Sequence, residues 1–491
     1  MEKKEKFEYD IDLGAIMDYV ENRFMLVIKD EDWTQEEIEM SINNIGPFTK
    51  SHLDMCIKNN SIDDALYEKY GVKRSLRDLN GIGINAGITN VSLSKSFTTD
   101  ENGNRIPCAG ELYYRGYEIH DLIKGFFLDN RFGFEECTYL LLFGILPDEK
   151  ELQNFKQVLN ISYDLPHHFI QDVIMKSPTA DIIANMTKST LALGSYDKKM
   201  GDNSLENVLQ QCIQLISMFP RLAVYSYQGY RHYELGKSCY IHKPLPELSF
   251  AENILSTLRS NRKYTRLEAR VLDLALVLHM EHGGGSNSTF TTRVVTSSGS
   301  DTYATMAAAL CSLKGPLNGG GDYQVMGMMK NIRDNVSDIT DEEEVGEYIR
   351  KIVNREAYDK TGIVYGMGHP FYSISDPRAL EFKKYVKLLA AEKGMDEEYA
   401  LYEMIERIAP KIIAEERKIY KGVCINIDYY SGLLYKMLKI PAEMFTPLFA
   451  IARVVGWSAH RMEELVNSYK IIRPAYTSIA EIKEYVPINE R

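Results

Sequence analysis

The sequence lacks the features that define several large classes of protein. Its seven cysteines stand singly and form no CxxC pair, which excludes a zinc knuckle or a disulfide framework and indicates a reducing compartment. Its most apolar runs, YLLLFGIL at 139–146 and VLDLALVL at 271–278, are too short to span a bilayer. Residues 1–24 carry acidic side chains throughout and no apolar segment, so we expect no signal peptide and a cytoplasmic protein.

Positive charge is also scarce. The 57 Lys and Arg residues are outnumbered by 69 Asp and Glu, which gives a net charge of −12 over 491 residues. This excess argues against nucleic acid as a partner, because nucleic-acid binding needs a basic face. An anionic substrate would therefore need a local cluster of arginine and histidine.

Helical periodicity dominates the chain, so we predict a mainly α protein. The predicted helices cover residues 134–144, 181–193, 205–219, 264–280, 302–313, 341–354, 398–420 and 446–469. Three helix starts have capping signals: Asp301, Thr340 with Glu343, and Thr446 followed by Pro447. Strand-like alternation is confined to 82–93 and 112–114, with an Asn-Gly turn at 102–103 between them, which predicts a small N-terminal β-ribbon.

Two histidine-containing stretches are candidates for chemistry. In HMEHGGG (279–285), His279 and His282 either satisfy helix-terminal carbonyls or face a ligand that the glycines let approach. No further ligand lies at a matching spacing, so we predict no metal site. In GMGHPFYSISDPRA (366–379), glycines flank His369, and Arg378 follows in a proline-containing turn that is either functional or purely structural.

Two further stretches place charge in apolar surroundings. In NIDYYSG (426–432), Asp428 is either a base whose pKa is raised by desolvation or the cap of the next helix. In FAIARVVGW (449–457), Arg453 interrupts an apolar helix face, which requires either a bound anion or a buried salt bridge. Arg473, in IIRPAY (471–476), would by itself be an ordinary loop residue.

A glycine-rich loop, LKGPLNGGGD (313–322), carries one polar side chain in its middle, Asn318. Taken together and in order, LHMEHGGGSNSTFTTRVV, SDTYATMAAALCSLKGPLNGGG, GMGHPFYSISDPRA and NIDYYSGLLYKMLKIP with FAIARVVGWSAHRMEE strongly resemble citrate synthases. The N-terminal GIGINAGITNVS, GELYYRGYEIHDLI and FEECTYLLLFGILP resemble that family as well. The resemblance runs from about residue 81 to 476, about four-fifths of the chain.

The resemblance implies a homodimer of nearly all-helical, two-domain subunits that close over a cleft. It implies a large domain at 81–319 and 440–491, a small domain at 320–439, and an N-terminal extension at 1–80. The family condenses acetyl-CoA with oxaloacetate and hydrolyses the product to citrate and CoA, with no metal or cofactor. We therefore expect oxaloacetate and an acyl-CoA as partners, and no membrane.

The resemblance also assigns site residues. It implies that Asp428 removes the methyl proton of acetyl-CoA and that His369 donates to the oxaloacetate carbonyl. It implies that the two oxaloacetate carboxylates are held by His282, Arg378, Arg453 and, across the dimer, Arg473. The expected CoA-binding residues are Lys314, Gly319, Gly320 and Gly321.

One segment departs from the family pattern. The family's G-P-x-H-G-G carries a histidine that hydrogen-bonds the thioester oxygen as it becomes an enolate, and here that position is Asn318. The usual A-N after the glycines is Gly321-Asp322, and the proline before the N-x-D motif is Ile425. Three hypotheses follow: a citrate synthase of reduced activity, an enzyme for another short acyl-CoA or 2-oxo acid (such as 2-methylcitrate formation), or a non-catalytic oxaloacetate binder.

Overall fold

The computed structural model describes residues 46–77, 83–315, 319–418, 422–467 and 470–491. The backbone divides into two compact units, Met1–Ile84 and Asn85–Arg491. The described elements of the first unit are helices α3 (Gly46–Asn60) and α4 (Ala65–Lys69) and the 3-10 turn η1 (Arg74–Leu76). They fall within the segment for which the sequence shows no family resemblance.

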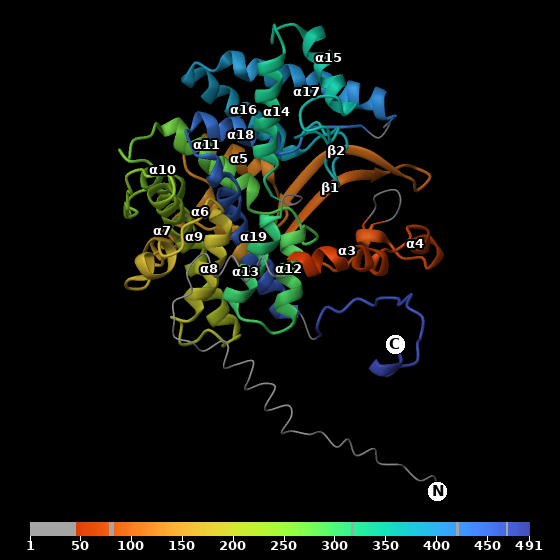
Figure 1. Cartoon of the computed structure of the whole chain (residues 1–491). Coiled ribbons are helices and arrows are strands. Elements are labelled where there is room, and N and C mark those ends of the chain that lie inside the picture. The colour runs from red at the N-terminus through yellow and green to blue at the C-terminus, as the bar shows by residue number, and fades with distance from the viewer. Residues whose placement is uncertain (1–45, 78–82, 316–318, 419–421, 468–469) are drawn as a thin grey trace. The chain divides into compact units, whose positions relative to one another are not determined.

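The second unit is built almost entirely of helices, which confirms the mainly α prediction (Figure 1). The helices of this unit are α5 (Ile119–Leu128), α6 (Phe134–Phe143), α7 (Glu149–Ile161), α8 (Ile182–Gly194), α9 (Leu205–Tyr233), α10 (Phe250–Leu258), α11 (Arg266–His279), α12 (Asn287–Ser297), α13 (Thr302–Lys314), α14 (Gly321–Asn335), α15 (Glu342–Val353), α16 (Pro377–Lys393), α17 (Asp396–Arg417), α18 (Asp428–Met437) and α19 (Phe445–Asn467), with short η2 (Ile170–Ile174), η3 (Ala442–Met444) and η4 (Ile488–Glu490).

A three-stranded antiparallel sheet lies at the start of this unit, in the order β1 (Ser92–Thr99), β2 (Arg105–Tyr114), β3 (Tyr117–Glu118). The predicted strand at 82–93 was wrong, because the first strand begins only at Ser92, whereas 112–114 lies within β2 as predicted. The Asn-Gly turn explains the shift. A tight turn at 102–103 pairs the residues on either side of it, so β1 must occupy 92–99 in order to face 105–114.

Two predicted helix starts move by one residue. Asp341, not Thr340, caps α15, and its carboxylate accepts from the backbone N–H groups of Glu343 and Glu344 at 2.8 and 3.3 Å. A carboxylate is the stronger acceptor at a helix N-terminus. Helix α19 begins at Phe445, so Thr446 lies inside the helix and does not cap it. The Asp301 cap of α13 is confirmed, with Ala304 N–H donating to it at 2.9 Å.

Helix α9 is much longer than the predicted 205–219, because it continues through Pro220 to Tyr233. Proline removes one helical hydrogen bond, but buried residues on both sides of it hold this helix in the core. Helix α19 packs against α9, α11 and α12, and its buried side chains include Trp457 and Arg461.

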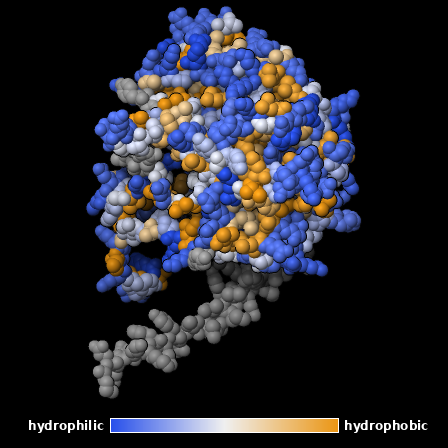
Figure 2. All heavy atoms as spheres, turned by 180° about the vertical axis from the view of Figure 1, so that it is seen from behind, coloured by the Kyte–Doolittle hydropathy of each residue, from blue (hydrophilic) through white to orange (hydrophobic). Residues whose placement is uncertain are grey.

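A second group of helices, α14 to α18, lies together at the top of Figure 1, where α14 and α16 pack on α18 and α15 packs on α17. Helix α16 also contacts α11 and β2, which joins this group to the rest of the unit. On the face seen in Figure 2, hydrophobic residues form a broken band between hydrophilic areas. Across the described ranges, no helix is long and apolar enough to cross a membrane.

Candidate active site

The loop that carries His369 is joined to the segment that carries Asp428. Met367 and Ile425 form an isolated antiparallel bridge. The Asn426 side chain donates to the Gly368 carbonyl at 3.0 Å, and Gly368 N–H donates to the Cys424 carbonyl at 2.7 Å. Hydrogen bonds therefore hold these two segments, which are distant in sequence, side by side.

The hydrogen bonds of His369 fix its tautomer. Its Nδ1 accepts from the backbone N–H groups of Phe371 and Tyr372 at 3.0 and 3.2 Å. An imidazole nitrogen that accepts carries no proton, so in the neutral ring the proton is on Nε2. His369 therefore presents an N–H donor on the side of the ring away from its own loop.

His282 lies next to His369, with 5.2 Å between the ring centroids. Its Nε2 is 3.1 Å from the hydroxyl of Tyr372. Burial lowers its pKa well below the ordinary value, and the positive charges of Arg378 and Arg453 lower it further. His282 is therefore a neutral hydrogen-bonding group.

His279, the other histidine of that stretch, has a structural role. It is buried in the last turn of α11, and its Nδ1 lies 2.7 Å from the Ala275 carbonyl. Burial lowers its pKa to about 3, so the ring is neutral and Nδ1–H donates to that carbonyl. The carbonyl-satisfying interpretation is thus correct for His279, while His282 faces the cluster.

Arg378 lies in the first turn of α16, not in the predicted turn. Asp376 caps this helix by accepting from Arg378 N–H at 3.0 Å, and it also binds the guanidinium through Nε and Nη2 at 3.0 and 2.7 Å. Both side chains are buried. The Arg378 Nη2 lies 3.5 Å from His369 Nε2, so the arginine and the histidine donor face the same space.

Arg453 reaches the cluster from α19. Its side chain is 3% exposed, its Nε donates to the His279 carbonyl at 2.7 Å, and its guanidinium lies 4.5 Å from the Phe449 ring centroid. Among the residues that the structure describes, it forms no ion pair with a carboxylate, and burial lowers its pKa to about 10. The salt-bridge alternative is therefore wrong for the described residues. A buried guanidinium that forms no ion pair in the described residues can accept an anion.

Asp428 is the first residue of α18, and its carboxylate makes no capping hydrogen bond to the helix. The carboxylate lies instead against Gly321, where any side chain would overlap it. Burial raises the pKa of Asp428 above its ordinary value. The capping alternative is therefore wrong, and Asp428 has the surroundings of a base.

The glycine loop lies at the start of α14. Gly320 precedes the helix with a φ of +84°, a conformation that favours glycine. Gly319, Gly320 and Lys314 line a cavity of about 500 Å³. The Lys314 ammonium pairs with Asp181 at 2.7 Å. Asn318 lies outside the described residues.

Arg473 is not brought to this cluster. It lies in the extended, exposed segment after α19, which is anchored where Ile472 N–H donates to the Ser297 hydroxyl at 3.0 Å. The structure thus joins His282, His369, Arg378, Arg453 and Asp428, and leaves Arg473 apart within one subunit.

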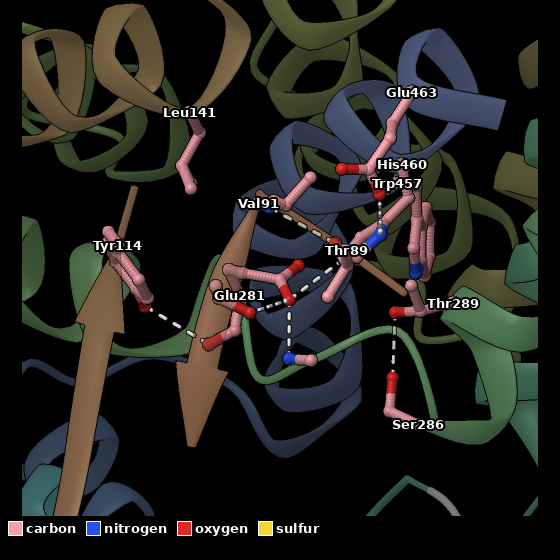
Figure 3. A network of polar contacts seen from close by, with 12 residues as sticks. Thr89, Val91, Tyr114, Leu141, Glu281, Ser286, Thr289, Trp457, His460 and Glu463 are labelled. Atoms are coloured by element: carbon pink, nitrogen blue, oxygen red, sulfur yellow. Dashed lines mark hydrogen bonds and ion pairs between the residues drawn. The ribbon is translucent and has the colours of Figure 1, made fainter. Parts of the chain in front are cut away.

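Sequence reasoning missed the residues that hold the cluster in place. Glu281 is fully buried and accepts from the Ser92 hydroxyl at 2.8 Å, while His460 Nε2 lies 2.9 Å away (Figure 3). Although burial opposes ionisation, His460, Arg453 and Ser92 hold the pKa of Glu281 at about 2. The Tyr114 hydroxyl donates to the Glu281 carbonyl at 3.1 Å. The signal in the sequence that could have identified Glu281 was its position directly before the candidate residue His282.

The fold and this cluster define a mainly helical protein in which buried histidine and arginine side chains lie near a buried carboxylate. The model of the citrate synthase C-terminal domain matches residues 85–475. Citrate synthase of Synechocystis sp. is 32% identical over 409 residues, 82% of this chain and 93% of that protein, and citrate synthase of Saccharolobus solfataricus is 32% identical over 413 residues, 83% and 99% of the two chains.

Solved structures agree with these relatives. The ternary complex of carboxymethyl coenzyme A and oxaloacetate with the citrate synthase of Thermoplasma acidophilum has a TM-score of 0.66 and 28% identity, covering 83% of this chain and 97% of that one. Citrate synthase from Pyrobaculum aerophilum has a TM-score of 0.67 and 27% identity, covering 84% and 95%. The chain belongs to the citrate synthase family.

Proposed function

We propose that the protein condenses acetyl-CoA with oxaloacetate and hydrolyses the product to citrate and CoA. The observation that carries this proposal is the meeting of a buried carboxylate, Asp428, with an N–H donor, His369, beside a buried arginine, Arg453, that forms no ion pair in the described residues. Acetyl-CoA is a substrate, and the reaction needs no further cofactor.

In this mechanism Arg378, Arg453 and His282 hold the carboxylates of oxaloacetate. Asp428 takes a proton from the acetyl methyl group, and the electrons of that C–H bond form the enolate. The enolate carbon attacks the ketone carbon, and His369 gives its Nε2 proton to the alkoxide that forms. Water then cleaves the thioester and releases the CoA thiol.

The rest of the assignment is part of the same proposal. Lys314 and the glycines at 319–321 contribute to CoA binding; the cavity of about 500 Å³ that Lys314, Gly319 and Gly320 line supports this. Residues 81–319 and 440–491 form the large domain, 320–439 the small domain, and 1–80 an extension. The grouping of α14 to α18 supports the small domain. The protein acts in the cytoplasm.

The test is release of CoA thiol from acetyl-CoA with oxaloacetate, measured with a thiol reagent. Propionyl-CoA is assayed beside it, and oxaloacetate binding is measured alone. We expect release with acetyl-CoA to exceed that with propionyl-CoA. Preference for propionyl-CoA would point to 2-methylcitrate formation, and binding without release from either thioester would identify a non-catalytic oxaloacetate binder.

We expect Asn318 to donate to the enolate oxygen and to do so less well than histidine. Loss of one preorganised donor costs roughly 100- to 1000-fold in rate, so Asn318→Ala should lower CoA release by about tenfold to 100-fold, since the native amide is the weaker donor. Oxaloacetate affinity should be unchanged, and Asn318→His should preserve or raise the rate. An alanine variant with wild-type turnover would show that another group activates the thioester.

The active unit is proposed to be a homodimer in which Arg473 enters the partner's site. Large hydrophobic residues exposed from the end of α8 to the start of α9, at Leu191, Tyr196, Met200 and Leu205, support such an interface. We expect Arg473→Ala and Asp428→Asn proteins to be inactive alone. An equal mixture should recover about a quarter of wild-type sites, because half the dimers are mixed and each carries one intact site.

The control for this experiment is Arg491→Ala, which removes another exposed C-terminal arginine and should keep full activity. Mixed dimers are confirmed by differently tagged subunits. If confirmed mixed dimers release no CoA, Arg473 does not act across the interface.

A further inference from the structure

A second carboxylate, Asp322, lies beside the base. Asp322 is in the first turn of α14, directly after Gly321, whose missing side chain makes room for the Asp428 carboxylate. The Asp322 carbonyl oxygen lies 2.8 Å from the place that a Cβ on Gly432 would occupy, one turn along α18. The start of α14 therefore packs closely against the backbone of α18, and each helix carries an aspartate in its first turn.

Neither carboxylate has a cationic partner close enough for an ion pair within the described ranges. The Asp322 side chain is 7% exposed, and its Oδ1 accepts from Tyr323 N–H at 2.8 Å. Two buried carboxylates this close favour sharing one proton over carrying two negative charges. Burial and the Asp428 charge raise the pKa of Asp322 to about 7.

Other charged and titratable groups also face the pair. Arg378 and Arg453, on α16 and α19, lower the pKa of Asp428, while Asp376 at the start of α16 raises it. Tyr435, one turn beyond Gly432 on α18, is neutral, since burial raises its pKa well above the ordinary value and both aspartates raise it further. The two arginines therefore favour the ionised form of Asp428. In the described residues they form no ion pair with either carboxylate.

We propose that Asp322 sets the strength of the Asp428 base, as a positioning residue that touches neither substrate. The inference rests on the proposed condensation and concerns the same site. The proton moves from the acetyl methyl carbon to a carboxylate oxygen of Asp428. Asp322 forms and breaks no bond in this step. Its negative charge raises the proton affinity of Asp428, and a stronger base removes a proton from a weakly acidic carbon faster.

The consequence is a dependence of rate on pH. Below the upper ionisation of the pair, the shared proton spends part of its time on Asp428 and blocks it. The acid limb of the pH profile therefore lies near neutrality in the wild type. An amide at position 322 cannot carry the negative charge. In that variant the ionisation of Asp428 alone would determine the acid limb of the pH profile, which would then lie at a lower pH.

The test compares kcat/KM for CoA release in wild type and Asp322→Asn from about pH 5 to about pH 9. We expect the acid limb of the variant to move down by about one pH unit or more and the plateau rate to fall about threefold to tenfold. Asp334→Asn, an exposed aspartate in the last turn of the same helix, is the matched control and should keep the wild-type profile.

Unfolding without substrate gives a second readout. Because the raised pKa lets the folded state hold a proton that the unfolded state releases, the contribution of Asp322 to wild-type stability should fall as pH rises from about 4 to about 7. Asp322→Asn should flatten that slope by about one proton. CoA release with an unmoved acid limb would overturn this inference alone. Absence of release from any acyl-CoA by the wild type would overturn the proposed function and this inference with it.

Discussion

Asp428→Asn should lower the rate of CoA release by about 100- to 10,000-fold while leaving oxaloacetate affinity within about threefold of wild type. The substitution keeps the shape of the side chain and removes the proton acceptor. The proposed oxaloacetate ligands are arginine and histidine side chains on α16 and α19 and in the loop after α11, so oxaloacetate binding should not need this carboxylate. Steady-state release of the CoA thiol and calorimetric titration with oxaloacetate measure the two effects separately.

The matched control is Asp396→Asn. Asp396 is also the first residue of a helix, α17, but it is exposed, so the substitution removes the same charge from the same helical position without touching the cluster. Its turnover should equal that of the wild type. Near-normal turnover in Asp428→Asn would show that another group takes the methyl proton.

Arg453→Met should weaken oxaloacetate binding about 100-fold or more without lowering the stability of the ligand-free protein. Two charge-assisted hydrogen bonds to a carboxylate contribute about 3 kcal/mol together, which corresponds to roughly 100-fold in affinity. In the ligand-free protein, however, the guanidinium is buried without an ion pair in the described residues. Methionine fills similar volume and removes the cost of burying the charge, so the melting temperature should stay level or rise.

The contrast is Arg461→Met on the same helix. Arg461 is equally buried, but its guanidinium donates four hydrogen bonds, to Thr296, Thr305, Asn203 and Ser300. Its loss should lower stability by about 3 kcal/mol and leave oxaloacetate affinity nearly unchanged. If Arg453→Met lowered stability as much as Arg461→Met and kept oxaloacetate affinity, Arg453 would be a structural residue.

Helices were predictable where one local signal decided them. The Asp301 carboxylate marked the start of α13. Apolar residues at helical spacing indicated α8 and α15. Errors arose where two local signals competed or where packing overrode one of them. Asp341 outcompeted Thr340 as a cap, and the buried face of α9 carried the helix through Pro220.

The candidate site was predictable residue by residue but not as an arrangement. The local sequence allowed two roles for Arg453, a buried salt bridge or the binding of an anion. The positions of the described carboxylates were needed to choose between these roles. The Asp428 carboxylate occupies the space that a side chain at Gly321 would need. These two residues are distant in sequence, so neither segment alone predicts this contact. The sequence showed only that Asp322 departs from the family pattern. The structure places Asp322 near Asp428, which suggests what the substitution does.

The ribbon strand β2 lies against the loop that carries the site. Gly110 N–H donates to the Ser375 hydroxyl at 3.1 Å, and a side chain at Gly110 would overlap the Ser375 carbonyl, the Tyr372 ring and Pro377. No substrate needs to touch Gly110 for it to be under selection. Drift at this position would have to be accompanied by changes in the 372–377 loop, so the two segments should covary among descendants of this chain even though they stand far apart in the gene.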